Sequence, residues 1–169
     1  MSPSPVPEGV EARIARLEDI EEARRLRMRY HHLVNSGRFD EVGTLFADDA
    51  VVDLSYLGKY VGREEIARGY RAIGDRSRFL VKQYGHSHTV DIEGNTGTGI
   101  AYLDARYARF GVSYMVAGRY EDVYERTADG WCFKSMTFEI FFSVPSALGW
   151  AGDELHYLRP DMRPGARDA

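Results

Sequence analysis

Cysteine and long apolar runs are nearly absent from this sequence. Its one cysteine, Cys132, cannot form a disulfide within the chain, so nothing indicates a secreted, disulfide-stabilised protein. No apolar run approaches the roughly 18 residues of a membrane-spanning helix, so we expect no membrane partner. Residues 1–9 lack the apolar segment of a signal peptide and are expected to form a disordered lead. We therefore expect a cytoplasmic protein.

The chain also lacks the excess of positive charge that nucleic-acid-binding proteins carry. Its formal net charge is -4. Arginines cluster at positions 24–29, but glutamates precede them at helical spacing, a pattern typical of a solvated helix face. With 169 residues, of which 44% are hydrophobic, the chain can form one domain. A domain of this size buries about 70% of its unfolded surface. We expect no nucleic-acid partner.

A long, aromatic-rich stretch lies between residues 112 and 142. Tyr, Phe, Val and Ile are frequent in it, neither arm contains proline, and Asp129-Gly130 provides a turn. We predict a long antiparallel hairpin at the centre of a curved sheet. Counting back from the turn gives the expected pairs: Arg126 with Trp131, Tyr124 with Phe133, Tyr120 with Thr137 and Glu121 with Met136.

Three helices and further strands are predicted before that hairpin. Apolar residues recur at helical spacing in residues 10–35, and shorter helices are predicted at residues 39–46 and 63–74. Extended segments are predicted at residues 50–56, 79–92 and 97–110. Helices followed by successive antiparallel strands favour an α+β fold, in which the helices pack on one face of a bent sheet.

Short motifs occur along the chain in a characteristic order. They are Arg29-Tyr30-His31-His32-Leu33-Val34-Asn35, Leu45-Phe46-Ala47-Asp48-Asp49-Ala50-Val51, Gly62-Arg63-Glu64-Glu65-Ile66, Asp91-Ile92-Glu93-Gly94-Asn95-Thr96, and Gly118-Arg119-Tyr120-Glu121-Asp122 with Asp129-Gly130-Trp131. Their order and spacing resemble the SnoaL-like branch of the nuclear transport factor 2-like superfamily over roughly residues 12–143. The resemblance implies a cone: a strongly curved antiparallel sheet packed on three N-terminal helices, with a deep pocket at the wide end. It implies a SnoaL-like domain over residues 10–143 and a C-terminal tail, residues 144–169, partly packed on that domain.

The resemblance also points to residues that would line the pocket. In dehydratase-like members, a tyrosine at the position of Tyr30 lines the pocket, where a phenol can stabilise developing enolate charge. The aspartate that follows five residues later is replaced by Asn35. The histidine of the bile-acid dehydratase and dehydrochlorinase members falls at Gln83. Neither amide accepts a proton at neutral pH, so the His–Asp dyad of those members is absent. Tyr30 could equally be part of the apolar face of its helix.

Two histidines are candidates for the missing acid/base group. Strict alternation along their strand places His86 and His88 on the same face as Val90, which should be buried. Both imidazoles are therefore expected to point into the cone, where an acidic partner suits general acid/base catalysis. A backbone carbonyl could satisfy a buried histidine instead, so a structural role stays open. We predict no metal site, because the nearest candidate third ligand, Glu93, falls in a hairpin turn.

Carboxylates in the central hairpin are candidates for the partner of His86. Glu121 falls at the pocket asparagine of scytalone dehydratase when the hairpins are aligned, so it is our first choice and Glu139 the second. A carboxylate in an apolar cavity would have a raised pKa and could act as a base. Asp122 is expected on the opposite, outer face. Strand parity decides among these residues, and one bulge would reverse it.

Aromatic and aliphatic residues could form the wall of the pocket. The predicted wall consists of Leu54, Tyr56, Tyr70, Tyr84, Phe138 and Trp150. Residues of this kind are also common in cores. Even so, 12% aromatic residues in a cone-shaped fold suit a planar or polycyclic apolar ligand.

Two functions are compatible with these observations. The first is a cofactor-independent acid/base enzyme acting on an apolar, oxygenated small molecule such as a polyketide, terpenoid or prenylated aromatic. Ring closure or isomerisation is favoured, with dehydration as the alternative. His86 would shuttle the proton, Glu121 would be its partner, and Tyr30 would orient the substrate oxygen together with Asn35; Gln83, His88 and Glu139 would contact substrate. The second is a non-catalytic module that binds a hydrophobic ligand or dimerises. The resemblance implies a homodimer in either case.

Overall fold

The computed structural model describes residues 9–74 and 80–149. Its helices are Val10–Asn35 (α1), the 3₁₀ helices Phe39–Leu45 (η1) and Ser55–Leu57 (η2), and Arg63–Gly74 (α2). Its strands are Phe46–Asp53 (β1), Lys59–Val61 (β2), Leu80–Glu93 (β3), Thr96–Arg109 (β4), Val112–Thr127 (β5) and Gly130–Pro145 (β6). Most of the predicted lead and tail lies outside the described residues.

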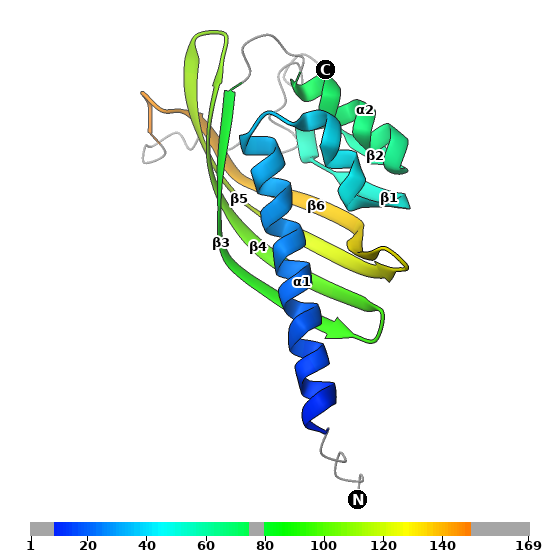
Figure 1. The fold of residues 1–169 in the computed structure, drawn as a ribbon. Helices are drawn as coiled ribbons and strands as arrows, with labels where there is room; N and C mark the ends of the chain where they lie inside the picture. The colour runs from blue at the N-terminus through cyan, green and yellow to red at the C-terminus, as the bar shows by residue number, and fades with distance from the viewer. Residues whose placement is uncertain (1–8, 75–79, 150–169) are drawn as a thin grey trace, which may run out of the picture.

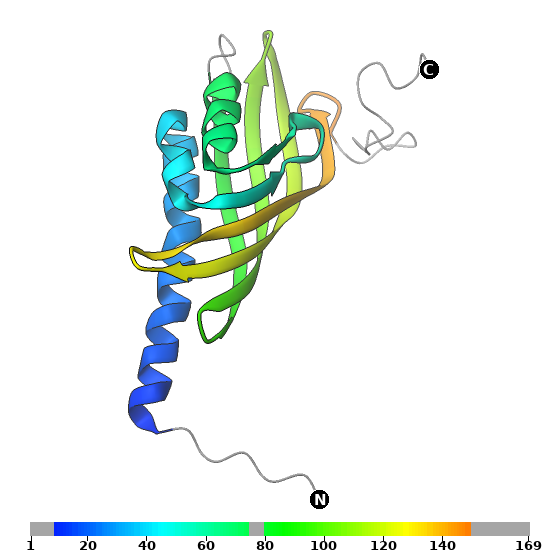
Figure 2. The same cartoon turned by 90° about the vertical axis from the view of Figure 1, so that its right-hand side faces the viewer.

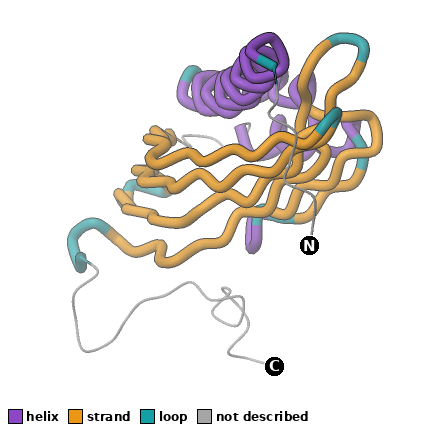
Figure 3. The backbone as a smooth tube through the Cα atoms, turned by 90° about the horizontal axis from the view of Figure 1, so that it is seen from below, coloured by secondary structure: helices purple, strands orange, loops and turns teal. Residues whose placement is uncertain are grey.

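All of these strands form one sheet in the order β2-β1-β6-β5-β4-β3. Neighbouring strands are antiparallel except β1 and β6, which run parallel because the chain crosses through α2 to the far edge and then meanders back. The strands bend around the helices (Figures 1 and 2), and both α-helices lie on the same face of the sheet (Figure 3). The predicted α+β fold is confirmed, with one parallel pair in an otherwise antiparallel sheet.

Helix α1 packs only its C-terminal half against the sheet. The buried side chains of that half include Leu26, Tyr30 and Val34, which recur at helical spacing. Ile14 and Leu17, two of the apolar residues at helical spacing, are exposed, because the N-terminal half extends past the end of the sheet (Figure 1). The packed half places Tyr30 against the concave face of the sheet.

The β5–β6 hairpin lies where it was predicted, but its register changes along its length. The pairs nearest the turn are the expected ones: Arg126 with Trp131 and Tyr124 with Phe133. A bulge between Val123 and Tyr124 then adds one residue to β6, so Tyr120 pairs with Phe138 rather than with Thr137. The rings of Tyr120 and Phe138 stack with their centroids 4.6 Å apart.

Candidate functional site

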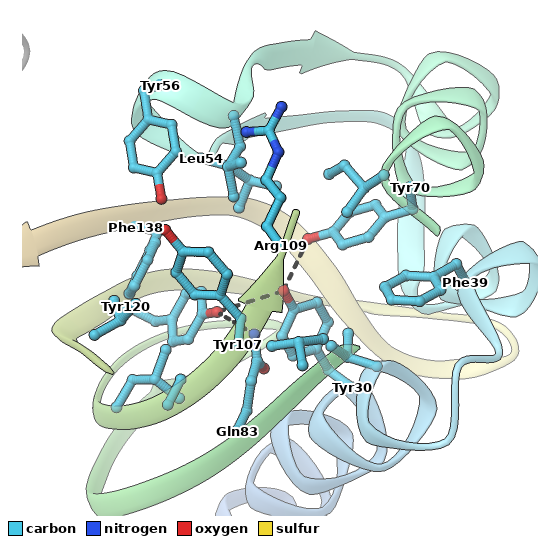
Figure 4. Close-up of a pocket in the computed structure, with 17 residues that line it drawn as sticks. Tyr30, Phe39, Leu54, Tyr56, Tyr70, Gln83, Tyr107, Arg109, Tyr120 and Phe138 are labelled. Atoms are coloured by element: carbon cyan, nitrogen blue, oxygen red, sulfur yellow. Dashed lines mark hydrogen bonds between the residues drawn. The ribbon is translucent and has the colours of Figure 1, made fainter. Parts of the chain in front are cut away.

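An apolar cavity lies between the concave face of the sheet, the C-terminal half of α1, and α2 (Figure 4). It is partly open to solvent. Its lining consists of Tyr30, Val34, Phe39, Leu54, Tyr56, Leu57, Tyr70, Ile73, Val81, Gln83, Leu103, Ala105, Tyr107, Arg109, Val116, Tyr120 and Phe138. Because most of these side chains are aliphatic or aromatic, the cavity suits a hydrophobic small molecule.

Three tyrosine hydroxyls meet at one end of the cavity, and we call Tyr30, Tyr70 and Tyr120 the phenol cluster. The Tyr30 hydroxyl lies 3.0 Å from that of Tyr70 and 3.5 Å from that of Tyr120 (Figure 4). The three residues come from α1, α2 and β5. Their two mutual contacts use two of the three hydroxyl protons, so one proton can be donated to a ligand. In the absence of a ligand, the Tyr70 hydroxyl donates to the Met136 sulfur at 3.9 Å, a weak contact that a ligand oxygen can replace.

Burial keeps the phenol cluster protonated. It raises the pKa of Tyr30 and Tyr120 well above the usual value, and it raises the pKa of Tyr70 as well. A neutral phenol donates a hydrogen bond but does not abstract a proton. The cluster can therefore present a hydroxyl donor to a substrate oxygen, and it does not act as a base.

A buried ion pair lies next to the phenol cluster. Arg27 Nε donates to Asp122 Oδ2 at 3.0 Å, and Nη2 makes a second contact with Oδ1. Burial acts to lower the pKa of Arg27, but Asp122 more than offsets this effect, so the guanidinium stays charged. Its central carbon lies 4.2 Å from the ring centroid of Tyr120 and 4.9 Å from that of Tyr30. A cation this close makes both phenols stronger hydrogen-bond donors.

His31 is a candidate that reasoning from the sequence missed. It follows Tyr30 on α1 and is buried. Its Nδ1 lies 2.9 Å from Oε1 of Gln83, and because an amide oxygen only accepts, Nδ1 carries the proton. Its Nε2 has no hydrogen-bond partner among the described residues. Burial, and after it the charge of Arg27, lowers the pKa of His31 to about 4, so the ring is neutral at pH 7.

The hydrogen bond from His31 fixes the orientation of the Gln83 amide. With Oε1 occupied, Nε2 of Gln83 donates to the Tyr120 hydroxyl at 3.4 Å. A continuous hydrogen-bonded chain therefore joins His31 to the phenol cluster. The sequence did contain a signal for this arrangement, because His31 lies four residues after Arg27 and shares its helix face.

Asn35 contacts the backbone of β3. Its Nδ2 donates to the Gln83 carbonyl oxygen at 2.8 Å, and its Oδ1 accepts from the Gln83 backbone N–H at 2.6 Å. Asn35 is not among the lining residues. Its side chain positions Gln83, which does line the cavity.

The two histidines predicted to face inward lie on opposite faces of β3. His86 pairs with Tyr102 and Thr89 with Ile100, so residues 87 and 88 together lie opposite a single residue of β4. This bulge, with Ser87 at a φ of 46°, reverses the alternation. His86 is exposed on the outer face, and the expectation that it points into the cone is wrong.

His88 faces inward, as predicted, but it does not line the cavity. Its Nε2 lies 3.1 Å from the Tyr124 hydroxyl, which donates to Asp122 Oδ2 at 2.8 Å. Because Tyr124 gives its proton to Asp122, Nε2 of His88 is the donor in the first contact. Burial, and after it Arg27, lowers the pKa of His88 to about 4. His88 therefore belongs to the ion-pair network.

The parity predicted for the carboxylates of β5 is reversed. Tyr120 and Asp122 are buried, so Glu121 between them points outward. Glu121 and Glu139 both pair with Arg119, at 2.8 and 2.7 Å, with about half of each side chain exposed (50% and 52%). The expectations that Glu121 or Glu139 faces the pocket and that Asp122 lies outside are wrong.

Other residues of the predicted site do line the cavity. They are Tyr30, Leu54, Tyr56, Gln83 and Phe138, together with Tyr70 from the predicted wall. Tyr84 is exposed, and Trp150 lies outside the described residues. The structure adds Tyr107, Arg109 and Tyr120. Alternation along β4, in which residues 105, 107 and 109 share one face, was the available signal for the first two.

Other groups that could carry chemistry are few. Cys132 is buried, and burial raises the pKa of its thiol. Among residues 9–74 and 80–149, no three His, Cys, Asp or Glu side chains are grouped as a metal site requires. No helix in the described part of the chain is long and apolar enough to cross a bilayer.

Comparisons with known proteins agree with this architecture. A SnoaL-like domain model matches residues 15–137, whereas no curated protein matches the sequence. A candidate aromatic ring hydroxylase from Novosphingobium aromaticivorans is 27% identical, with 76% of this chain and 94% of that one covered and a TM-score of 0.69. An NTF2-like protein with a cystatin-like fold from the same species is 25% identical, with 78% and 88% covered and a TM-score of 0.63. A hexachlorocyclohexane dehydrochlorinase (LinA, type 2) is 17% identical, with 90% and 97% covered and a TM-score of 0.67.

The curved sheet, the helices on one face and the apolar cavity define an α+β protein of the NTF2-like, or cystatin-like, fold. Within that class, the chain belongs to the family of SnoaL-like domains. The predicted family and fold are thus confirmed. Its structural neighbours include proteins named as enzymes, among them the dehydrochlorinase.

Proposed function

We propose that this protein catalyses, without a cofactor, a ring closure or isomerisation of an apolar, oxygenated small molecule. The observation that carries the proposal is the convergence of the Tyr30, Tyr70 and Tyr120 hydroxyls at one end of an apolar cavity. Donors held in place in a site that excludes water can stabilise an oxygen as it gains negative charge. Polarisation of one substrate oxygen is the step that these residues perform.

Such a reaction needs no net gain or loss of protons. In a ring closure, a substrate hydroxyl adds to the β-carbon of a conjugated ketone: a C–O bond forms, the C=C π electrons move, and the ketone oxygen becomes an enolate. The hydroxyl proton moves within the substrate to that oxygen, which a phenol of the cluster holds by a hydrogen bond. Each phenol of the cluster ends neutral, as burial requires. The enol product then tautomerises to the ketone.

The lining favours this reaction over a dehydration. Dehydration by the dyad of related enzymes requires a group that abstracts a proton. In the part of the chain that the structure describes, neither a carboxylate nor an imidazole lines the cavity. Tyr30 therefore keeps the role predicted for it, whereas His86 and Glu121 take no part. Gln83 and His31 orient the phenol cluster instead.

The same composition of the lining supports a second candidate, a module that binds a hydrophobic ligand without converting it. Donors without a base are sufficient to hold an oxygenated ligand in place. The two candidates differ in whether the bound molecule reacts.

2′-Hydroxychalcone distinguishes them, because it is apolar and closes to a flavanone by the addition described above. We expect the wild-type protein to accelerate the loss of enone absorbance, and Tyr30→Phe to lower the rate by about 10²–10³-fold. Tyr84→Phe, an exposed tyrosine of the outer face, is the matched control and should keep the wild-type rate. If the chalcone quenches the protein fluorescence but closes no faster than in buffer, the protein binds the ligand without converting it. Equal rates for wild type and Tyr30→Phe would refute the role of the cluster.

For either function we also propose a homodimer through the outer face of the sheet. Exposed apolar side chains on this face include Tyr84, Ile100, Tyr102, Val123 and Phe141. Arg119 lies on the same face between Glu121 and Glu139, so two copies can form complementary charge pairs about a two-fold axis. Sedimentation should give a dimer for the wild type and a monomer for Tyr102→Glu; a monomeric wild type contradicts this assembly.

A further inference from the structure

The cavity has a second polar end, which the proposed reaction does not use. Arg109, the last residue of β4, is the charged residue of the lining, which within the described chain contains no Asp, Glu, Lys or His. Its guanidinium carbon lies 4.8 Å from the ring centroid of Phe110. No Asp or Glu in residues 9–74 or 80–149 forms an ion pair with it. The mouth of the cavity thus carries a positive charge that no described neighbour neutralises.

Hydroxyl groups lie at the same end. The Tyr107 hydroxyl is 3.2 Å from Ser143 Oγ, and the Tyr56 hydroxyl interacts with both. In Figure 4 the hydroxyls of Tyr56 and Tyr107 face each other, apart from the linked hydroxyls of Tyr30 and Tyr70. A guanidinium beside hydroxyl donors suits an anionic oxygen, above all a carboxylate.

The two polar ends are separated along β4. Gln83, which bonds the phenol cluster, pairs with Ala105. The backbone of Arg109 lies four residues farther along β4, about 14 Å from that of Ala105, whereas Ser143 lies level with Ala105 across β5. Aliphatic side chains, including Leu57 and Val116, contribute to the lining. The phenol cluster and Arg109 are thus two separate polar places on a lining whose other residues are mostly apolar.

We propose that the ligand is an elongated apolar acid, whose carboxylate binds Arg109 at the mouth and whose far end carries a carbonyl or ether oxygen that meets the phenol cluster. The assignment of the far oxygen rests on the proposed function, whereas the carboxylate site does not. Binding at both ends fixes the orientation of the ligand. The reacting end is the one remote from the carboxylate.

Three related probes separate the two ends. 6-Acetyl-2-naphthoic acid carries a carboxylate and a carbonyl at opposite ends of a flat apolar body. Its methyl ester lacks the charge, and 6-ethyl-2-naphthoic acid lacks the carbonyl. Affinities are measured by calorimetry at low salt, where an exposed charge pair is least screened. Arg109→Gln is the test variant. Arg106→Gln is its matched control, since Arg106 lies on the same strand with an exposed side chain paired to Asp104.

We expect the wild type to bind the acid about three- to tenfold more tightly than the ester. Arg109→Gln should abolish this preference, and Arg106→Gln should retain it. Equal affinities of wild type for acid and ester, a preference that survives Arg109→Gln, or failure of the acid to bind at millimolar concentration would each overturn the carboxylate site. If the acid is preferred but the acetyl and ethyl compounds bind equally, and Tyr30→Phe changes neither, the role of the phenol cluster fails while the site at Arg109 stands.

Discussion

The side chain of Asn35 binds both backbone polar groups of Gln83, accepting from its N–H at 2.6 Å and donating to its carbonyl at 2.8 Å. The family resemblance implied that these two positions correspond to a His–Asp pair, but an amide side chain does not remove a proton. Asn35 instead joins the end of α1 to β3, and Gln83 presents its amide to the phenol cluster. In this chain Asn35 and Gln83 together hold the cavity wall in place.

Asn35→Asp should therefore weaken the structure. A carboxylate can still accept from the Gln83 N–H, but it has no donor for the Gln83 carbonyl and repels it. We expect the free energy of unfolding to fall by about 1–3 kcal/mol, measured by urea denaturation at pH 7. Asn95→Asp, in the exposed β3–β4 turn, should change it by no more than about 0.5 kcal/mol. Similar losses for both variants would contradict the contact described.

Removal of one member of the buried Arg27–Asp122 pair should be costly. Arg27→Met leaves the Asp122 carboxylate buried without its cation, so we expect a loss of about 3–5 kcal/mol in urea denaturation. The double variant Arg27→Met/Asp122→Leu should lose less, because no uncompensated charge remains. A double variant as unstable as the single one would show that the contacts of Arg27 with the Tyr120 and Tyr30 rings dominate over charge compensation.

Stability should decrease as the pH falls from about 6.5 to about 4. His31 and His88 have folded-state pKa values lowered to about 4, below the ordinary value of 6.5. Between these values the unfolded chain binds more protons than the folded one, so the contribution is complete above pH 6.5 and is lost toward pH 4. For the buried His31, the free energy of unfolding should fall by about 2–3 kcal/mol between pH 7 and pH 4.5. Urea denaturation at pH 7, 5.5 and 4.5 measures it.

His31→Asn is the variant that tests the assignment to this ring. The Asn amide can donate to Gln83 in place of Nδ1 but does not titrate, so the dependence on pH should become shallower. His32→Asn changes the neighbouring, exposed histidine and should leave the wild-type slope. An unchanged slope in His31→Asn would assign the effect to other groups.

His86→Ala should leave both stability and turnover close to wild type. The imidazole is exposed on the outer face of β3, away from the cavity. Substitutions at such positions change the free energy of unfolding by about 0.5 kcal/mol or less. The check is the chalcone closure rate together with a urea denaturation curve. A hundredfold loss of rate with unchanged stability would return His86 to the mechanism.

Local features of the chain were sufficient to predict much of the architecture. Helical spacing in α1, the Asp129-Gly130 turn and the two aromatic arms around it depend on neighbouring residues, and each appears where it was expected. The predicted strand register near that turn was also correct, because those pairs lie only a few residues from the turn. The family resemblance placed Tyr30 and Gln83 at the cavity.

Strand parity could not be predicted, because it depends on pairing with another strand. One extra residue at positions 87–88 turned His86 outward while leaving His88 inside. On β5, Tyr120 and Asp122 took the inner face, and Glu121 was left to solvent. Alternation alone leaves the choice of face open wherever both faces carry apolar and charged residues.

The sequence by itself determined the order of helices and strands, because local spacing and turn residues encode them. Only the tertiary structure brought Tyr30, Tyr70 and Tyr120 together, since they lie 40 and 50 residues apart in sequence and meet through the packing of α1 and α2 on the curved sheet. The same packing buried Arg27 and His31 beside them. The arrangement of donors in the cavity is thus a property of the folded sheet and its helices.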